Sequence, residues 1–340
     1  MLLESIPQPV DIYEAHKRIS PYIHRTPVIT SKTLDELSQC NLFFKCENFQ
    51  KAGAFKSRGA CNAVFSLDDD ESAGGVATHS SGNHAQALAR AALLRGIKSY
   101  IVMPRTAPIV KIAAVKHYQG KITFCEPTLA AREETLKNLL QQTNAIEIHP
   151  YNNYSVIAGQ ATATMEIFEE IGWPDFLVAP VGGGGLLSGS SLAVRYFSNH
   201  TKTLGAEPEG ADDAYLSFHS GMIVPSIHPV SIADGLLTSL GSRTFPVIIE
   251  NVTEILRVSE EKIVKAMQLI WERMKIIIEP SAAVSFGAVL QYPEICVTRI
   301  CSLHYTAPAH HFLQLFPLLR GLLPQAGILA VHYCPMHFPG

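Results

Sequence analysis

The 340-residue chain has 47% hydrophobic and 17% charged residues, and its formal net charge is -3. This length allows two domains with a substantial core, and the composition is typical of a folded protein rather than a disordered one. The near-neutral charge, without any basic run, argues against nucleic acid as a partner.

The sequence also favours a protein that is neither secreted nor embedded in a membrane. Residues 1–10 lack the basic start and apolar run of a secretory signal. The most apolar window, residues 312–331, is interrupted by two prolines and an arginine, so no membrane span is expected. Seven scattered cysteines predict reduced thiols and a cytoplasmic protein.

The predicted elements begin with an amphipathic helix over residues 11–22 and a short strand over residues 41–47. From residue 74 onward, strands and helices alternate. The first series has strands at 76–78, 100–103 and 122–124 and helices at 82–95, 107–117 and 129–142; the second has helices at 155–171 and 186–197 and strands at 176–181 and 203–207. Two such series predict an α/β protein with two parallel-sheet lobes. We expect a large domain over residues 1–73 and 149–292 and a small domain over residues 74–148.

Lys56 lies in a run of small residues, Gly53–Ala60, with Phe55 beside it. A lysine held against apolar and small neighbours loses hydration, its pKa falls, and the neutral amine can form a Schiff base. Most lysines are solvated surface groups. This segment alone therefore does not distinguish a catalytic lysine from an ordinary one.

Four successive glycines, Gly182–Gly185, lie between a predicted strand and a predicted helix. Such a loop lets backbone N–H groups converge on an anion at the helix N-terminus. A phosphate monoester suits it better than a dinucleotide, because neither the G-x-G-x-x-G nor the P-loop template fits. A purely structural glycine turn is the alternative.

A second strand-to-helix junction, Ser80–His84, contains small hydroxyls, a glycine and an amide. It suits an α-carboxylate at a helix N-terminus, although a serine N-cap on an ordinary helix is the alternative. Together the three motifs fit pyridoxal phosphate: a lysine for the imine bond, a loop for the phosphate and a pocket for the substrate carboxylate.

With these motifs the chain resembles the fold-type II pyridoxal-phosphate enzymes, whose fold is like that of the tryptophan synthase β subunit. Within them it is similar to the eukaryotic-type serine racemases and the serine/threonine dehydratases. The signatures that match are His24–Val28, Gly53–Ala60, Ser80–His84, Gly182–Gly185, Ala206–Pro208, Ile232–Gly235 and Glu279–Ser281. The resemblance implies that the cofactor lies in the cleft between the two lobes.

The resemblance further implies that Lys56 is the Schiff-base lysine and takes the Cα proton on one face, while Ser81 works on the opposite face. Inverting a stereocentre through a planar carbanion needs an acid and a base on opposite sides. Related threonine dehydratases commonly have alanine in place of Ser81, so this serine favours racemisation of serine, accompanied by dehydration to pyruvate and ammonia. Asn83 would bind the phenolate oxygen of the cofactor. The other residues implied are Gly182, Gly183, Gly184, Gly185 and Leu186 for the cofactor, and Ser80, Ser81, Gly82, Asn83 and His84 for the substrate.

An acidic turn supplies a candidate metal site. Glu207, the carbonyl of Ala211 and Asp213 match the divalent-cation ligands of the family, and all-oxygen ligands suit Mg²⁺ or Ca²⁺. An acidic turn on a solvated face is the alternative.

The resemblance also implies a homodimer, and it raises ATP as an allosteric activator. Lys51, Ser31 and Lys275 match the positions that bind nucleotide at a subunit interface in animal members of the family.

The composition changes after Tyr292. Residues 293–340 hold only three charged side chains, and the Ser-Gly-Gly-Asn signature, whose serine contacts the cofactor's pyridine nitrogen in the family, does not occur there. We therefore expect an atypical tail that has replaced the family C-terminus and cost a core strand, with residues 295–300 as the segment that would substitute for it. Cys296, Cys301 and His304 lack a fourth ligand with a convincing spacing for a metal site.

Three interpretations stay open: a serine racemase that also dehydrates serine, a serine/threonine dehydratase with little racemisation, and a catalytically impaired isoform that lacks the C-terminal signature. A nucleotide-dependent dehydrogenase is disfavoured because the glycine fingerprint fails.

Overall fold

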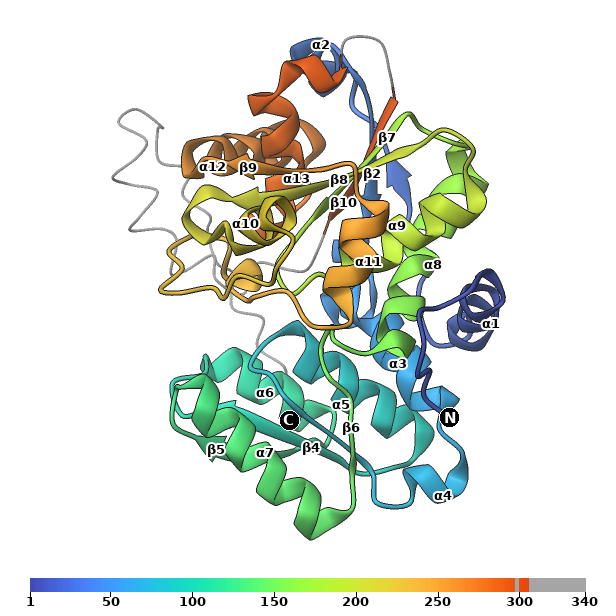
Figure 1. Cartoon of the computed structure of the whole chain (residues 1–340), viewed down its shortest axis with the longest axis vertical. Coiled ribbons are helices and arrows are strands. Elements are labelled where there is room, and N and C mark those ends of the chain that lie inside the picture. Colours follow the sequence, from blue (N-terminus) through green and yellow to red (C-terminus); the bar gives the residue numbers. More distant parts are fainter. Residues whose placement is uncertain (297–299, 306–340) are drawn as a thin grey trace, which may run out of the picture. The chain divides into compact units, whose positions relative to one another are not determined.

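The computed structural model describes residues 1–296 and 300–305, and side chains up to residue 295. The described residues lie within one compact unit. Within it the strands build two sheets, one six-stranded and one four-stranded (Figure 1).

The six-stranded sheet has the order β1-β2-β10-β7-β8-β9. Every neighbouring pair is parallel except β1 and β2, which are antiparallel. Its strands are β1 (Val28–Ile29), β2 (Asn41–Cys46), β7 (Phe176–Pro180), β8 (Lys202–Pro208), β9 (Glu254–Val258) and β10 (Ile300–Tyr305).

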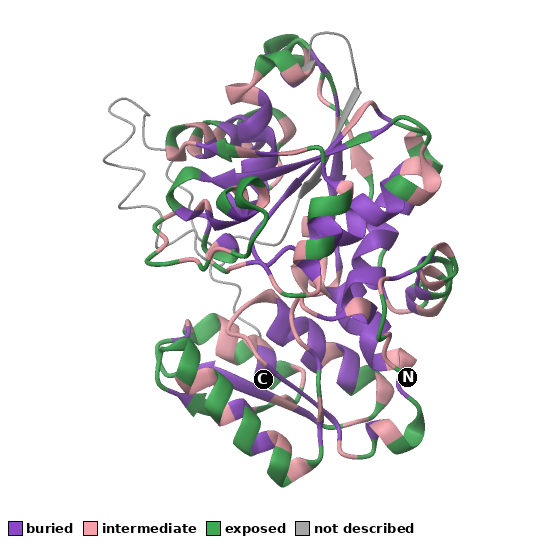
Figure 2. Ribbon diagram, viewed as in Figure 1, coloured by how far each residue is buried: buried purple, intermediate pink, exposed green. Residues whose placement is uncertain are grey.

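Apolar side chains cover both faces of this sheet, as a parallel sheet requires. Along β7, Val178 belongs to a core with helices α12 (Glu260–Leu269) and α13 (Pro280–Gln291). Its neighbours Leu177 and Ala179 belong to the opposite core, with α9 (Gly185–Phe197) and α11 (Thr244–Asn251). Figure 2 shows that α9 and α13 are buried along most of their length.

The four-stranded sheet has the order β5-β4-β3-β6, and all its pairs are parallel. Its strands are β3 (Val76–His79), β4 (Ser99–Pro104), β5 (Lys121–Cys125) and β6 (Ile146–Glu147); its helices are α5 (Asn83–Arg95), α6 (Ile109–His117) and α7 (Leu129–Thr143). Ile101 packs in a core with α5, whereas the next residue, Val102, packs with α7.

The remaining helices surround the two sheets. They are α1 (Pro9–Ile19), α2 (Lys32–Ser38), α3 (Lys56–Ser66), α4 (Asp69–Ser72), α8 (Tyr154–Ile171) and α10 (Asp213–Ser220). Short helical turns cover Glu47–Phe49, Lys51–Gly53, Glu209–Ala211, Asp234–Leu236, Ile270–Met274 and Pro293–Cys296.

The predicted alternation of strands and helices is confirmed. Helix α3, for which no range was predicted above, begins at Lys56 because Phe55 already has helical dihedral angles. The predicted domain boundaries stay a prediction, although residues 76–147 supply all the strands of the smaller sheet.

The expected loss of a core strand is wrong. β10 lies in the middle of the six-stranded sheet, with Ile300 opposite Asn41 of β2 and Ser302 opposite Leu177 of β7. The substitute strand therefore starts at residue 300, whereas residues 293–296 form a helical turn. Because β10 pairs on both sides, β2 and β7 do not become open sheet edges. The rest of the predicted tail, and the side chains of Cys296, Cys301 and His304, lie outside the described residues.

Four buried charged side chains fix the start of α3. Arg58 donates to both carboxylate oxygens of Glu47 at 2.8 Å and to both of Glu166 at 2.7 Å. Lys45 donates to Glu166 and to the carbonyl of Thr26, each at 2.7 Å. We call Lys45, Glu47, Arg58 and Glu166 the buried charge cluster; it ties β2, α3 and α8 together two residues after Lys56.

The cysteines agree only in part with the expectation of reduced thiols. Cys46, Cys61 and Cys125 are free and buried. Cys40, in contrast, is disulfide-bonded, which corrects the expectation at that position. Among the described residues, no helix is long and apolar enough to cross a membrane.

Candidate active site

Lys56 is the first residue of α3, and its side chain is half-buried. The Nζ atom donates a hydrogen bond of 2.8 Å to the carbonyl oxygen of Pro150 and lies 5.0 Å from the centre of the Phe55 ring. Burial lowers the pKa of Lys56 to about 8, against the opposing effect of the Glu279 carboxylate. The amine is therefore neutral in a large fraction of molecules at mildly alkaline pH, as a nucleophilic lysine must be.

The glycine loop lies between β7 and α9, where side chains have no room. A Cβ atom placed on Gly183 would lie 2.3 Å from the ring of Tyr151, and one on Gly182 would lie 2.9 Å from the backbone of Leu236. Gly184 has a φ of 87°, which favours glycine. The first N–H groups of α9 have no partner within the helix, so this junction can accept an anion.

Residues 150 and 151 connect the lysine to the glycine loop. The Pro150 carbonyl accepts the hydrogen bond from Lys56, and the ring of the next residue, Tyr151, lies against Gly183. A half-buried amine and a glycine loop at a helix N-terminus are thus neighbours. This arrangement fits pyridoxal phosphate, which needs a covalent bond to lysine and a site for its phosphate.

The serine loop, Ser80–Asn83, follows β3 and leads into α5, and its residues are partly exposed. The Asn83 side chain donates to Glu279 at 3.4 Å, and Glu279 in turn acts electrostatically on Lys56. The loop therefore belongs to the same site as the lysine. Glu279 was part of a sequence signature, but no role was predicted for it; only its position in the fold reveals one.

His84 points away from the exposed loop. Its side chain is 2% exposed, and its Nε2 lies 2.9 Å from the carbonyl oxygen of Ile148. Burial lowers the pKa of His84 to about 3, and it does the same for His149. Both imidazoles are neutral at physiological pH, so they do not compete with Lys56 as cations. The predicted contact between His84 and the substrate stays a prediction. Because the side chain is buried, the backbone of His84 would have to make that contact.

The comparisons with known proteins agree with this geometry. Residues 19–299 match the family model described as pyridoxal-phosphate dependent enzyme. The chain belongs to this family. It is 52% identical over 283 residues to a serine racemase of Dictyostelium discoideum, covering 83% of this chain and 87% of the relative. It is 50% identical over 289 residues to a β-hydroxyaspartate dehydratase of Paracoccus denitrificans, covering 85% and 92%. The solved structure of maize serine racemase has a TM-score of 0.88 at 39% identity, covering 94% of this chain and 99% of that one.

The family match ends at residue 299, shortly after the composition change at Tyr292. The expectation of a fold-type II enzyme similar to serine racemases is confirmed. The roles predicted for individual site residues stay predictions, since sequence similarity alone does not assign them.

The three candidate cation ligands lie between the end of β8 and the start of α10. Glu207 accepts hydrogen bonds from the backbone N–H groups of Ala214 at 3.0 Å and Tyr215 at 2.8 Å. Both carboxylate oxygens of Asp213 are buried and have no hydrogen-bond partner among the described residues. Burial raises the pKa of Glu207 to about 9 and that of Asp213 to about 6. Two buried carboxylates, of which Asp213 has both oxygens unused, beside the carbonyl of Ala211 fit a hard divalent cation completed by water.

In the part of the chain that the structure describes, no group of three or more His, Cys, Asp or Glu side chains is placed to bind a metal ion. The candidate site relies on two carboxylates and one backbone carbonyl.

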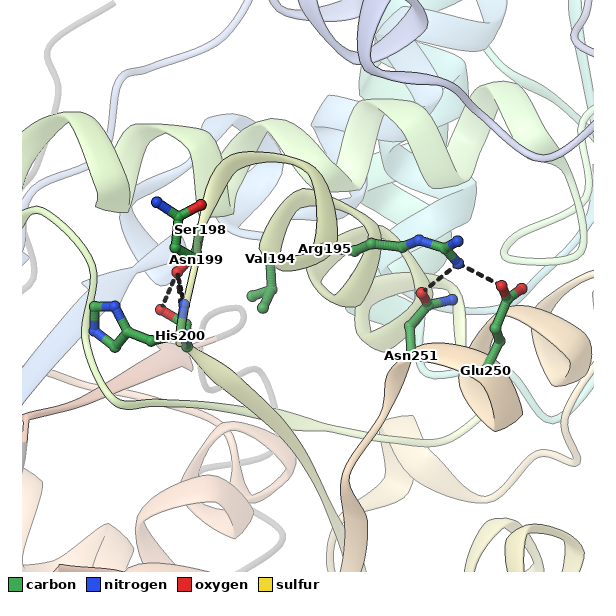
Figure 3. A pocket seen from close by; sticks show the side chains of 8 residues that line it. Val194, Arg195, Ser198, Asn199, His200, Glu250 and Asn251 are labelled. Atoms are coloured by element: carbon green, nitrogen blue, oxygen red, sulfur yellow. Dashed lines mark hydrogen bonds and ion pairs between the residues drawn. The ribbon is translucent and has the colours of Figure 1, made fainter.

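A hollow of about 440 Å³ lies at the C-terminal end of α9, opposite the glycine loop at its N-terminal end. Figure 3 shows that Arg195 there points at Glu250 and Asn251, while His200 lies on the other side of the hollow. Arg195 donates to Glu250 at 2.5 Å and to Asn251 at 3.0 Å. The guanidinium of Arg195 is therefore already paired, and none of the predicted site residues lines this hollow.

Proposed function

We propose that this chain is a pyridoxal-phosphate-dependent serine racemase that also dehydrates serine to pyruvate and ammonia. One observation supports it above all: a half-buried lysine of lowered pKa lies close to a glycine loop at the N-terminus of α9. The chain is 52% identical to a serine racemase over most of the length of both proteins, and this similarity supports serine as the substrate.

Lys56 and the loop Gly182–Leu186 would hold the cofactor, with Asn83 at its phenolate oxygen. When bound, pyridoxal phosphate supplies an electron sink for a carbanion at the substrate Cα. Lys56 removes and returns the Cα proton on one face, and its burial keeps the amine neutral enough to act as a base. The serine loop receives the substrate carboxylate, because backbone N–H groups at the start of α5 favour an anion.

Ser81 would exchange the Cα proton on the opposite face. Its place on the partly exposed serine loop supports this role. Racemisation needs both Lys56 and Ser81, whereas elimination of water needs only one base and help for the leaving hydroxyl. Product analysis therefore separates the two activities.

The test compares the wild type with Ser81→Ala and Lys56→Ala, incubated with L-serine while D-serine and pyruvate are measured. We expect Ser81→Ala to lose racemisation by about 100-fold or more and to keep most elimination. Lys56→Ala should lose both. If Ser81→Ala still racemises while elimination falls, the proposed role of Ser81 is wrong.

A dehydratase with little racemisation is the second candidate, and the similarity to a β-hydroxyaspartate dehydratase supports it. In that case the wild type would form pyruvate from L-serine, or the keto acid from L-threonine, and almost no D-serine. A chain that binds cofactor but forms neither product would support the impaired isoform instead.

Four further features belong to the proposal. The orphaned oxygens of Asp213 support a Mg²⁺ or Ca²⁺ site with Glu207 and the Ala211 carbonyl. The free, buried thiols of Cys46, Cys61 and Cys125 support a cytoplasmic protein, whereas the disulfide-bonded Cys40 does not. A homodimer activated by ATP, with Lys51, Ser31 and Lys275 at the nucleotide, rests on the family resemblance. So does the division into a large domain (1–73 and 149–292) and a small domain (74–148).

A further inference from the structure

Helix α8 contacts both α3, which begins at Lys56, and α9, which begins at the glycine loop (Figure 1). A Cβ atom on Gly159 of α8 would lie 2.6 Å from the Cα atom of Gly59 on α3. A Cβ atom on Gly189 of α9 would lie 2.6 Å from the carbonyl oxygen of Ile157 on α8. Backbone therefore meets backbone at both contacts of α8, and neither contact has room for a methyl group.

Hydrogen bonds hold α3 at a fixed position along α8. Arg58, two residues after Lys56, donates to the hydroxyl of Thr162 at 3.1 Å. Asn62, one turn further along α3, donates to the carbonyl oxygen of Ser155 at 2.7 Å. All four of these side chains are buried, and breaking a buried hydrogen bond leaves a polar group without a partner. Sliding of α3 along α8 is therefore costly.

The segment just before α8 contacts both parts of the cofactor site. The Pro150 carbonyl accepts the hydrogen bond from Lys56 at 2.8 Å. The ring of Tyr151 lies 2.3 Å from the place that a Cβ atom on Gly183 would occupy. Lys56 and the glycine loop therefore share α8 and its preceding segment as a common support.

We propose that α8 is a spacer that sets the distance between Lys56 and the glycine loop, with Gly159 and Gly189 as positioning residues. The Lys56 amine condenses with the aldehyde carbon of pyridoxal phosphate, forming a C=N bond and releasing the aldehyde oxygen as water. The aldehyde and the phosphate are a fixed distance apart, so both can be bound only when the protein spacing matches. This inference rests on the proposed roles of Lys56 and the loop Gly182–Leu186.

Two ligands separate the covalent bond from the phosphate contact. Pyridoxal phosphate can bond to Lys56, whereas pyridoxine phosphate has an alcohol in place of the aldehyde and binds only noncovalently. Their dissociation constants are measured on the full-length apoenzyme, by visible absorbance for pyridoxal phosphate and by calorimetry for pyridoxine phosphate. We expect Gly159→Ala and Gly189→Ala to lower the preference for pyridoxal phosphate at least about tenfold, because they displace α3 or α9 from α8. The affinity for pyridoxine phosphate should stay close to that of the wild type.

Two further variants complete the series. Gly287→Ala on α13 is the matched control, because its Cβ atom would lie 2.9 Å from Cγ1 of Val258 and so overpacks a helix contact that does not involve α8. It should leave the preference unchanged, whatever its effect on Tm. Asn62→Ala is a milder variant that removes the hydrogen bond to Ser155 and adds no atoms. It should lower the preference in the same direction by a smaller factor.

An unchanged preference in Gly159→Ala and Gly189→Ala, or an equal loss of affinity for both ligands, would overturn the inference. If neither variant folds, an unchanged preference in Asn62→Ala overturns it. Failure of the proposed function looks different: a wild type that forms neither D-serine nor pyruvate, while the variants change the preference as expected, contradicts the activity and supports the spacer. A wild type with no greater preference for pyridoxal phosphate than Lys56→Ala contradicts the role of Lys56 and, with it, the inference.

Discussion

The buried charge cluster leads to a prediction about stability that can be worked out from its hydrogen bonds. It contains two cations, Lys45 and Arg58, and two carboxylates, Glu47 and Glu166, and none of the four side chains is more than 2% exposed. The substitution Lys45→Met keeps the length of the side chain but leaves two buried carboxylates with a single guanidinium. An uncompensated buried charge costs about 3–5 kcal/mol of stability, and the Thr26 carbonyl loses its hydrogen bond as well.

Neutralising Glu166, the ion-pair partner of Lys45, should recover much of the lost stability. In Lys45→Met/Glu166→Gln the positive and negative charges of the cluster balance again, with one cation and one anion left. Arg58 keeps both of its hydrogen bonds to Glu47. We therefore expect the double variant to be destabilised by at least about 2 kcal/mol less than the sum of the two single variants, as for contacting residues in general.

Urea denaturation followed by circular dichroism measures the loss, from the unfolding midpoints of the wild type, the two single variants and the double variant. Lys32→Met is the control, because the Lys32–Glu36 pair is 3.9 Å apart and largely exposed and should contribute little. If Lys45→Met changes the midpoint no more than Lys32→Met, or if the single effects simply add, the four charges do not act as one buried unit.

The other predictions concern the cofactor and the cation. Because burial lowers the pKa of Lys56 to about 8, the neutral amine becomes more abundant as the pH rises through that value. Covalent capture of pyridoxal phosphate by the apoenzyme, followed by visible absorbance, should accelerate between about pH 7 and pH 9 and be absent in Lys56→Ala. Gly183→Ala places a Cβ atom 2.3 Å from the Tyr151 ring; it should weaken cofactor binding at least about tenfold, and the added change Tyr151→Ala should recover part of the loss. Mg²⁺ or Ca²⁺ at one hundred times its Kd should stabilise the wild type by about 2.7 kcal/mol, seen as a raised Tm, and should not stabilise Asp213→Asn.

The parts of the site that lie next to a strand or helix end could be predicted from the sequence. Lys56, the glycine loop and the serine loop are short contiguous motifs, and each follows from local chemistry at a junction between two elements. Their assembly into one site could be inferred only by asking which cofactor needs all three. The fold class followed from the alternation of strands and helices, which does not depend on long-range contacts.

The parts that depend on distant segments could not be predicted. The ion pair between Lys111 and Asp234 joins residues 123 positions apart, and Glu166 contacts Arg58 across 108 positions. No periodicity marks such partners, since a charged residue on a helix is usually solvated. The side chains of Arg58 and Lys45 are fully buried, which opposes that tendency, and only tertiary packing makes this possible.

The C-terminal strand illustrates why a missing motif does not mean a missing element. The position between β2 and β7 needs a segment that pairs its backbone on both sides, and β10 meets this need with a six-residue register along β2. Backbone pairing places few demands on the side chains, so a sequence unlike that of the family can occupy the place. The catalytic demands are stricter, because the family serine acts through its hydroxyl. Folding and activity are therefore separate questions for this chain: β10 completes the sheet from which the glycine loop leaves, whereas the missing Ser-Gly-Gly-Asn signature would, by the family resemblance, affect the pyridine side of the cofactor. Normal capture of pyridoxal phosphate combined with slow turnover of serine would therefore support the impaired isoform, whereas normal turnover would show that this chain does not need the signature.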